Sequence, residues 1–218
     1  MFKKKIFLFI ITLFLLQVSC EKDDNPNENW QAGKDWIDTR DGKHYKTVRI
    51  GNQIWMAENL NYITDSGSWN YFNEECLGEV FGRLYSWETA CKSCPEGWHL
   101  PTDDEWIELE IYIGIHPKSA HYDGYRGNDE GGKLKEVGFD HWYPPNKGAT
   151  DEYGFTALPA GCYWEPYFHF LIDRAYFWTS TEDSISQPWT RCLSSSGSDI
   201  GRYPDYKESG LSVRCIKD

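Results

Sequence analysis

Six cysteines constrain the fold of this chain more than any other feature, because a loop-rich domain can be cross-linked through them. They follow a seventh, Cys20, and lie at Cys76, Cys91, Cys94, Cys162, Cys192 and Cys215. An even number in an exported chain predicts disulfides, and six cysteines allow 15 pairings that spacing alone does not distinguish. Cys91 and Cys94 form a Cys-x-x-Cys pair, but a second such pair for zinc and the βαβ context of a redox motif are both missing from the sequence. Structural disulfides are therefore favoured.

The N-terminal segment predicts that the chain is exported. A lysine run at residues 3–5 precedes an apolar run at residues 6–16, which is shorter than the roughly 20 residues of a membrane-spanning helix. Because Ser19 is followed by Cys20, the segment resembles a lipoprotein signal, whose cysteine becomes the acylated first residue. Gln17 departs from the Leu, Ala or Val usual at that position, and an ordinary secreted protein is the alternative.

The residues after Cys20 indicate a tether and an address. The stretch EKDDNPNEN is polar and contains proline, as flexible linkers do. Its acidic start is similar to the short signal that sends some bacterial lipoproteins to the outer face of the outer membrane; a plain solvated linker is the alternative. We therefore expect a signal peptide over residues 1–19, a tether over residues 20–37 and one folded domain over residues 38–218. The expected location is the outer membrane, through several acyl chains, at the cell surface.

Charge and composition exclude some partners. The formal net charge of the 218-residue chain is −12, so phosphate backbones are repelled and nucleic acid is not an expected partner. Aromatic residues make up 17% of the chain, with scattered glycine and proline, which favours an irregular domain over a helical bundle. After the N-terminal segment, no apolar run is long enough to span a membrane.

Local patterns predict short strands around two helices. Apolar residues alternate on both sides of Gly51-Asn52, which is typical of a β-hairpin. A first helix is expected where Leu84, Trp87 and Cys91 share a face, and an extended piece at residues 98–100 follows it. A capping box from Thr102 to Glu105 and an apolar stripe of Trp106, Leu109 and Ile113 predict a second helix. Strands are expected at residues 176–178, 189–193 and 211–216, and Leu211, Val213 and Cys215 should share one strand face.

Several long segments, taken together, resemble one family of exported bacterial proteins. They are DGKHYKTVRIGNQIWMAENLNY, GRLYSWETAC, CPEGWHLPTDDEW, GGKLKE, DEYGFTALPAG, FWTSTED and LSVRCIKD, in the family's order over residues 38–218. The chain is thereby similar to the Fibrobacter succinogenes major paralogous domain. The resemblance implies an α+β, C-type-lectin-like fold with two helices beside small twisted antiparallel sheets, and carries no assigned activity.

The resemblance also implies a disulfide framework. In a lectin-like fold, a cysteine after the first helix bonds to one in the last strand, and Cys94 and Cys215 occupy those positions. Cys162 with Cys192, and Cys76 with Cys91, would then be the remaining pairs.

Catalytic motifs are not recognisable in the sequence. There is no Gly-x-Ser-x-Gly elbow, His-Glu-x-x-His, P-loop or dinucleotide fingerprint, and the six histidines are dispersed. His99, between Trp98 and Leu100, is interpreted as structural. Lectin-like folds include formylglycine-generating oxidases, but their paired reactive cysteines have no recognisable counterpart here. We therefore expect that the chain is not an enzyme and has no catalytic residues.

Two groups of residues are candidates for binding. Oxygen ligands for a possible Ca²⁺ ion are concentrated in one glycine-rich loop, at Asp123, Asn128, Asp129 and Glu130, although a solvated acidic loop gives the same pattern. Otherwise no cofactor is expected. Aromatic side chains that can stack on sugars or anchor a protein lie in predicted loops, at Trp142, Tyr143, Tyr163, Trp164 and Tyr167.

The sequence as a whole favours a lipid-anchored recognition module that binds a glycan or a protein outside the cell. The alternatives are a structural component of the envelope or of a surface appendage, and an enzyme with an unrecognised site. A binder should present a concave aromatic cluster with polar groups at its rim. A structural protein should present a flat apolar patch or an exposed strand edge, and an enzyme a pocket with strongly perturbed ionisable groups.

Overall fold

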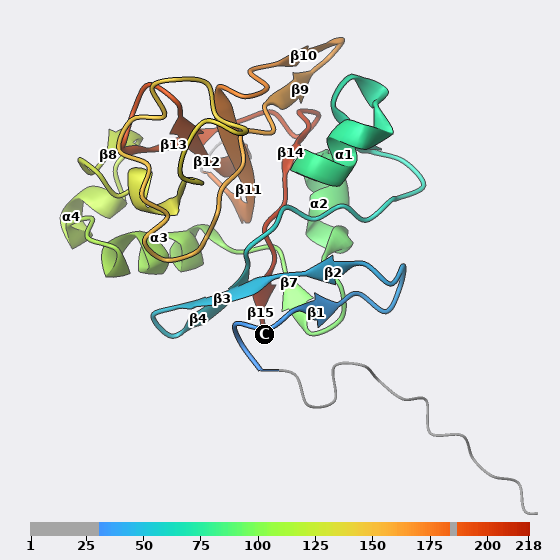
Figure 1. Cartoon of the computed structure of the whole chain (residues 1–218), viewed down its shortest axis with the longest axis horizontal. Helices are drawn as coiled ribbons and strands as arrows, with labels where there is room; N and C mark the ends of the chain where they lie inside the picture. Colours follow the sequence, from blue (N-terminus) through green and yellow to red (C-terminus); the bar gives the residue numbers. More distant parts are fainter. Residues whose placement is uncertain (1–30, 184–186) are drawn as a thin grey trace, which may run out of the picture.

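The computed structural model describes residues 31–183 and 187–218, which form an α+β fold of small sheets and short helices (Figure 1). The predicted signal peptide, Cys20 and most of the predicted tether lie outside the described residues. The last two tether residues belong to the fold, because strand β1 (Trp36–Ile37) pairs with β2 (His44–Tyr45) and Trp36 is buried. The folded part therefore begins slightly earlier than residue 38.

The helices are short. They are α1 (Glu75–Phe81), α2 (Trp87–Ser93), α3 (Asp103–Tyr112) and α4 (Pro117–Ala120), with 3₁₀ turns η1 (Tyr71–Asn73) and η2 (Gly132–Leu134). Over residues 31–183 and 187–218, none of them has both the length and the apolar character that crossing a membrane requires.

The largest sheet has seven strands in the order β5-β6-β14-β11-β12-β13-β8. Their bounds are Ser68–Trp69, Leu84–Tyr85, Leu211–Ser212, Arg174–Glu182, Pro188–Ser194, Ile200–Pro204 and Gly124–Arg126, respectively. Adjacent strands are antiparallel except β11 and β14, which are parallel. The second sheet contains β3 (Thr47–Ile50), β4 (Gln53–Met56), β15 (Ile216–Lys217) and β7 (Trp98–His99), and a separate hairpin contains β9 (Cys162–Trp164) and β10 (Tyr167–His169).

Several local predictions are confirmed. Strands β3 and β4 form the expected hairpin, and Gly51 between them has a φ of 61°, which glycine adopts without steric cost. The Thr102 hydroxyl accepts a hydrogen bond from the Glu105 N–H while the Glu105 carboxylate accepts one from the Thr102 N–H, so the capping box begins α3 as predicted. The first helix was predicted too long: Leu84 lies in β6, and α2 begins only at Trp87.

The two faces of the large sheet pack differently, because side chains alternate across a strand. On β11, Phe177 faces α3, where its ring lies 5.6 Å from that of Trp106. Its neighbours Tyr176 and Trp178 face the opposite side, and Trp178 packs in a second cluster with Ala90 of α2. Burial of each such large apolar side chain contributes about 1.5–3 kcal/mol, so one helix on each face holds the sheet in place.

Five charged side chains are buried between α3 and the sheet. Glu110 binds the guanidinium of Arg126 through both of its oxygens and also pairs with Arg191. Asp103, at the start of α3, pairs with Arg191 at 2.8 Å and with Arg202 at 2.7 Å. Each charge is compensated, which burial requires. The network therefore ties α3 to strands β8, β12 and β13.

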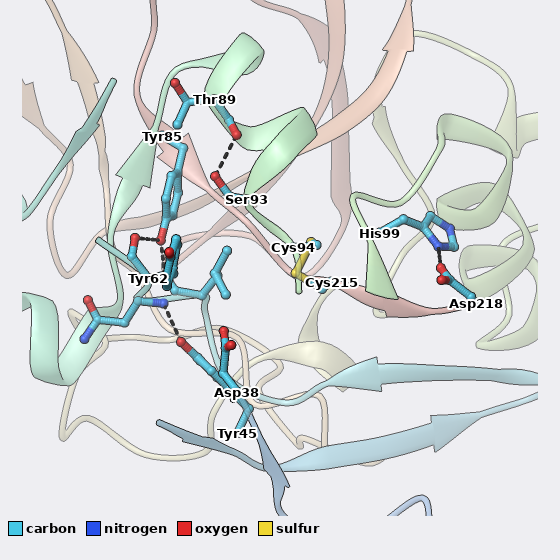
Figure 2. Close-up of a disulfide and its surroundings, with 12 residues drawn as sticks. Asp38, Tyr45, Tyr62, Tyr85, Thr89, Ser93, Cys94, His99, Cys215 and Asp218 are labelled. Atoms are coloured by element: carbon cyan, nitrogen blue, oxygen red, sulfur yellow. Dashed lines mark hydrogen bonds and ion pairs between the residues drawn. A yellow bond between two sulfur atoms is a disulfide. The ribbon is translucent and has the colours of Figure 1, made fainter. Parts of the chain in front are cut away.

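A disulfide joins the end of α2 to the chain just before β15 (Figure 2). The sulfur atoms of Cys94 and Cys215 are 2.03 Å apart and their Cα atoms are 5.9 Å apart, which confirms this pairing. Figure 2 also shows His99 and Asp218 to one side of the bridge. The His99 Nδ1 lies 2.6 Å from Asp218 Oδ1 and its Nε2 lies 2.9 Å from Glu105 Oε1, a structural role as predicted.

The other two predicted bridges are wrong, because their four cysteines are free thiols. Cys76 on α1 and Cys91 on α2 are exposed on two different helices. Cys162 and Cys192 are buried in one cluster but lie on opposite sides of β11. On one side of β11, Gly161, which precedes Cys162, pairs with Ala175. On the other side, the next β11 residue, Tyr176, pairs with Cys192 of β12. Cys162 and Cys192 are therefore two strand spacings apart, which is about 9–10 Å. A disulfide permits a Cα separation of at most about 7 Å.

Candidate functional site

A cleft opens on the face of the large sheet opposite α3. Its floor is a row of directly paired residues on four successive strands: Tyr176, Cys192, Gly201 and Tyr125, from β11 to β8. Helix α2 packs against β11 on this face, whereas residues of β12, β13 and β8 line an open cavity. The cleft is therefore formed by the part of the sheet that no helix covers.

Glycine at position 201 allows its neighbours to pack closely over this row of residues. A Cβ atom added there would lie 2.9 Å from a ring carbon of Tyr203, 3.1 Å from Cβ of Cys192 and 3.2 Å from a ring carbon of Tyr125. The space above Gly201 is thus enclosed by two tyrosine rings and a thiol. Any other residue would fill the floor of the cleft.

The thiol at the floor is neutral at neutral pH. Burial raises the pKa of Cys192 to about 11, although Arg174 and the hydroxyls of Tyr125 and Tyr176 act in the opposite direction. Burial also raises the pKa of Tyr176 and of Tyr125 well above the ordinary value for tyrosine. The floor therefore presents neutral hydroxyl and thiol groups, with the guanidinium of Arg174 donating to the Tyr176 hydroxyl at 3.3 Å.

The cleft has two lobes, which share Trp164 and Asp205. The sheet lobe has a volume of about 340 Å³, and the loop lobe, beside the segment after β13, has a volume of about 510 Å³. Both volumes fall in the range of small-molecule sites, roughly 300–1,000 Å³. The sheet lobe is lined by the floor residues except Gly201, with Arg174, Thr190, Tyr203 and Pro204. The loop lobe is lined by Glu165, Tyr206, Glu208 and Ser209.

Aromatic rings and a carboxylate form the wall between the lobes. Trp164 is half-buried and packs edge-on against Phe170 at 5.6 Å and against Tyr176 at 6.0 Å. Asp205 Oδ1 accepts hydrogen bonds from the Tyr206 N–H at 2.7 Å and from the Ser209 hydroxyl at 2.9 Å. Burial raises the pKa of Asp205, against the effect of these bonds. The cleft can thus offer stacking faces, hydroxyl groups and a partly desolvated carboxylate to one ligand.

The five aromatic residues singled out from the sequence do not form one surface. Trp142 is 1% exposed and belongs to the core, so its assignment to a binding surface is wrong; its indole N–H donates to the Ala157 carbonyl. Tyr163 is half-buried and packs on Trp69 and on Phe168. Tyr143 and Tyr167 are exposed, but neither lines the cleft. Of the five, Trp164 lines it.

The loop proposed for calcium is held together by the protein's own groups. Glu130 is buried, and its carboxylate accepts from the N–H groups of Asn128 and Asp129. Asp123 and Asp129 form ion pairs with basic side chains. Within residues 31–183 and 187–218, no group of three or more His, Cys, Asp or Glu side chains is placed to hold a metal. Three of the four side chains are thus engaged by groups of the protein, and calcium binding at this loop stays a prediction of the sequence.

Sequence reasoning missed most of the cleft. Residues that line it occupy alternate positions of strands, as Arg174 and Tyr176 do on β11, while the adjacent Ala175 and Phe177 pack in the core. The sequence predicts these strands from their apolar face, whereas the cleft is lined by the opposite, polar and aromatic face. The alternation itself was the available signal.

A comparison with models of known protein families shows which family the chain belongs to. A family model described as the Fibrobacter succinogenes major domain matches residues 48–217. The chain belongs to this family. The match covers both sheets from β4 onward and every residue of the cleft, so the cleft lies within the family domain. No curated protein and no solved structure matches the chain.

Proposed function

We propose that this family member is a recognition module that binds a glycan in the two-lobed cleft, outside the cell. The observation that carries the proposal is the concave arrangement of Trp164, Tyr125 and Tyr203 with polar groups at the rim. Aromatic faces stack on the apolar faces of sugar rings, and hydroxyl and carboxylate groups bind sugar hydroxyls. Binding would depend on shape, stacking and hydrogen bonds.

We propose no chemical step in the cleft. The floor groups Cys192, Tyr125 and Tyr176 are neutral at neutral pH because burial raises the pKa of each. A neutral thiol is a poor nucleophile. The α+β arrangement, with helices on both faces of the large sheet and a disulfide from the end of α2 to the residue before β15, supports a C-type-lectin-like classification, which we also propose.

A glycan array tests the proposed function. The purified protein should bind a limited set of glycans, equally with calcium and with a chelator, because no calcium site is proposed in the cleft. Trp164→Ala should reduce binding by about tenfold through loss of stacking, which corresponds to roughly 1.4 kcal/mol. Tyr143→Ala, which removes an exposed ring outside the cleft, is the matched control. Absence of glycan binding, or binding unaffected by Trp164→Ala, would contradict the proposal.

We further propose that lipid on Cys20 anchors the protein in the outer membrane at the cell surface. The residues that support this lie in the N-terminal segment, outside the described part of the chain. Mass spectrometry of protein purified from membranes should find an N-terminal peptide that begins at Cys20 and carries acyl chains. An unmodified N-terminus on protein released in soluble form would contradict the anchor and would leave the cleft proposal standing.

A further inference from the structure

The loop lobe of the cleft is acidic and has no internal counter-ion. Glu165, Asp205 and Glu208 line it, and none of the ion pairs in residues 31–183 and 187–218 includes them. Lys207, adjacent in sequence, pairs instead with Glu182 at 3.0 Å. The lobe therefore presents uncompensated negative charge to whatever occupies it.

Asp205 differs in this respect from the buried carboxylates of the core. Asp103 and Glu110 are each bound by two arginine side chains. Asp205 is half-buried, and its hydrogen-bond donors, which include the Tyr206 N–H and the Ser209 hydroxyl, are neutral. A partly buried carboxylate without a cationic partner is unfavourable. A cation in the lobe would offset that cost.

The walls of the same lobe favour a cationic organic group over a metal ion. Trp164 and Tyr206 line the lobe, and aromatic faces attract ammonium groups at short range. By contrast, the acidic side chains of the lobe are not placed to coordinate a metal together, as holds for all the described residues. The aromatic faces of Trp164 and Tyr206 are apolar, and the apolar face of a sugar ring can pack against them.

We infer that the loop lobe binds the ammonium group of an amino sugar, so that the ligand is a glycan containing hexosamine residues with free amines. The inference rests on the proposed function, because it specifies which glycan the cleft selects. The ammonium lies against Asp205 between Trp164 and Tyr206, and the sugar ring stacks on the indole. Acidic glycans are disfavoured, since the lobe and the chain, with its net charge of −12, both repel them.

Calorimetric titration of the purified protein tests this specificity. The probes are a hexamer of β-1,4-linked glucosamine, its fully N-acetylated counterpart and the corresponding glucose hexamer, at a pH where the amines are charged. We expect the glucosamine hexamer to bind about tenfold more tightly than either neutral hexamer, as a charge-assisted hydrogen bond predicts. Asp205→Asn should abolish this preference, whereas Glu96→Gln, on an exposed glutamate outside the cleft, should retain it.

The outcomes separate the inference from the function on which it depends. Equal binding of the three hexamers, or an unchanged preference in folded Asp205→Asn, overturns the amine specificity and leaves glycan binding intact. No binding of any hexamer, together with an empty glycan array, overturns both. If Asp205→Asn does not fold, titration of the wild-type protein at a pH at which the glucosamine amines are uncharged carries the test. A preference for the glucosamine hexamer that persists at that pH overturns the inference.

Discussion

The hydroxyl of Tyr125 lies 3.9 Å from the sulfur of Cys192, although the two residues belong to strands separated by β13. They meet because Gly201, the residue between them, has no side chain. The contact between Tyr125 and Cys192 spans β13, so strand residues alone form the floor of the cleft. The floor of the sheet lobe is thus formed by the sheet itself, and the close packing of its side chains depends on one glycine.

Gly201→Ala should fill this floor. The new Cβ would lie within 3.2 Å of Tyr203, Cys192 and Tyr125, so the rings must move by a few tenths of an ångström. We expect about 1 kcal/mol of destabilisation, near the lower end for overpacking, and at least a roughly tenfold loss of glycan affinity. Thermal unfolding and calorimetric titration measure the two effects. Full affinity in the folded variant would show that the ligand does not reach the floor.

Removal of the disulfide should destabilise the whole domain. The bridge between Cys94 and Cys215 closes a loop with a sequence separation of 121 residues. In the chain-entropy model such a loop is worth about 5 kcal/mol, so the double alanine variant should melt roughly 10–20 °C lower. Cys76→Ala, which removes an exposed free thiol, should leave the melting temperature nearly unchanged. Similar melting temperatures for all three proteins would refute the structural importance of the bridge.

Glu110→Gln should destabilise the protein, because it leaves buried arginine side chains without their carboxylate partner. Glu110 is fully buried and compensates both Arg126 and Arg191, so its loss leaves positive charge unpaired in the core. The expected decrease in the free energy of unfolding is about 3–5 kcal/mol, measured by denaturant titration. Glu108→Gln, an exposed position on the same helix, should change it by less than about 0.5 kcal/mol. A small effect at position 110 would contradict the network's role.

His99 should make stability depend weakly on pH. Burial lowers its pKa, but the hydrogen bonds to Asp218 and Glu105 outweigh burial and raise the pKa above the ordinary value of 6.5. The folded state therefore binds the proton more tightly than the unfolded state. The resulting stabilisation is complete below the unfolded pKa and is lost as pH rises through the raised pKa.

The side chain of His99 is 39% exposed, so the effect should be below about 1 kcal/mol. Denaturant titrations at several pH values should show that the difference between wild type and His99→Gln shrinks as pH rises. His44→Gln, at an exposed histidine, provides the comparison. If the difference in stability between the two proteins grew with pH, the pKa of His99 would be lowered on folding, which would contradict this prediction.

The sequence predicted those features that depend on local patterns. The hairpin around Gly51, the capping box from Thr102 to Glu105 and the apolar stripe from Trp106 follow from short-range rules, and all three are present. The Cys94–Cys215 bridge came from family resemblance, since spacing leaves 15 pairings open. The two wrong pairings show what local patterns do not predict. Strand β11 lies between Cys162 and Cys192 because of the order of strands in the sheet, which is set by contacts between distant segments.

The cleft could not be located for the same reason. Trp142 and Trp164 both occur in segments rich in glycine, proline and aromatics, yet one is 1% exposed in the core and the other lines the cleft. Burial of an aromatic residue in a loop depends on which distant strands cover it. Tyr125 and Cys192 are 67 residues apart in sequence and meet only through the order of β8, β13 and β12.

The most direct test of the cleft as the binding site is a ¹⁵N NMR titration of the indole N–H signals with the glycan identified on the array. Trp164 lines both lobes, whereas Trp106 and Trp142 are buried in the core. The account predicts that the Trp164 signal shifts with ligand concentration while those of Trp106 and Trp142 stay in place. A saturable interaction that leaves the Trp164 signal unmoved would place the ligand elsewhere and contradict the account.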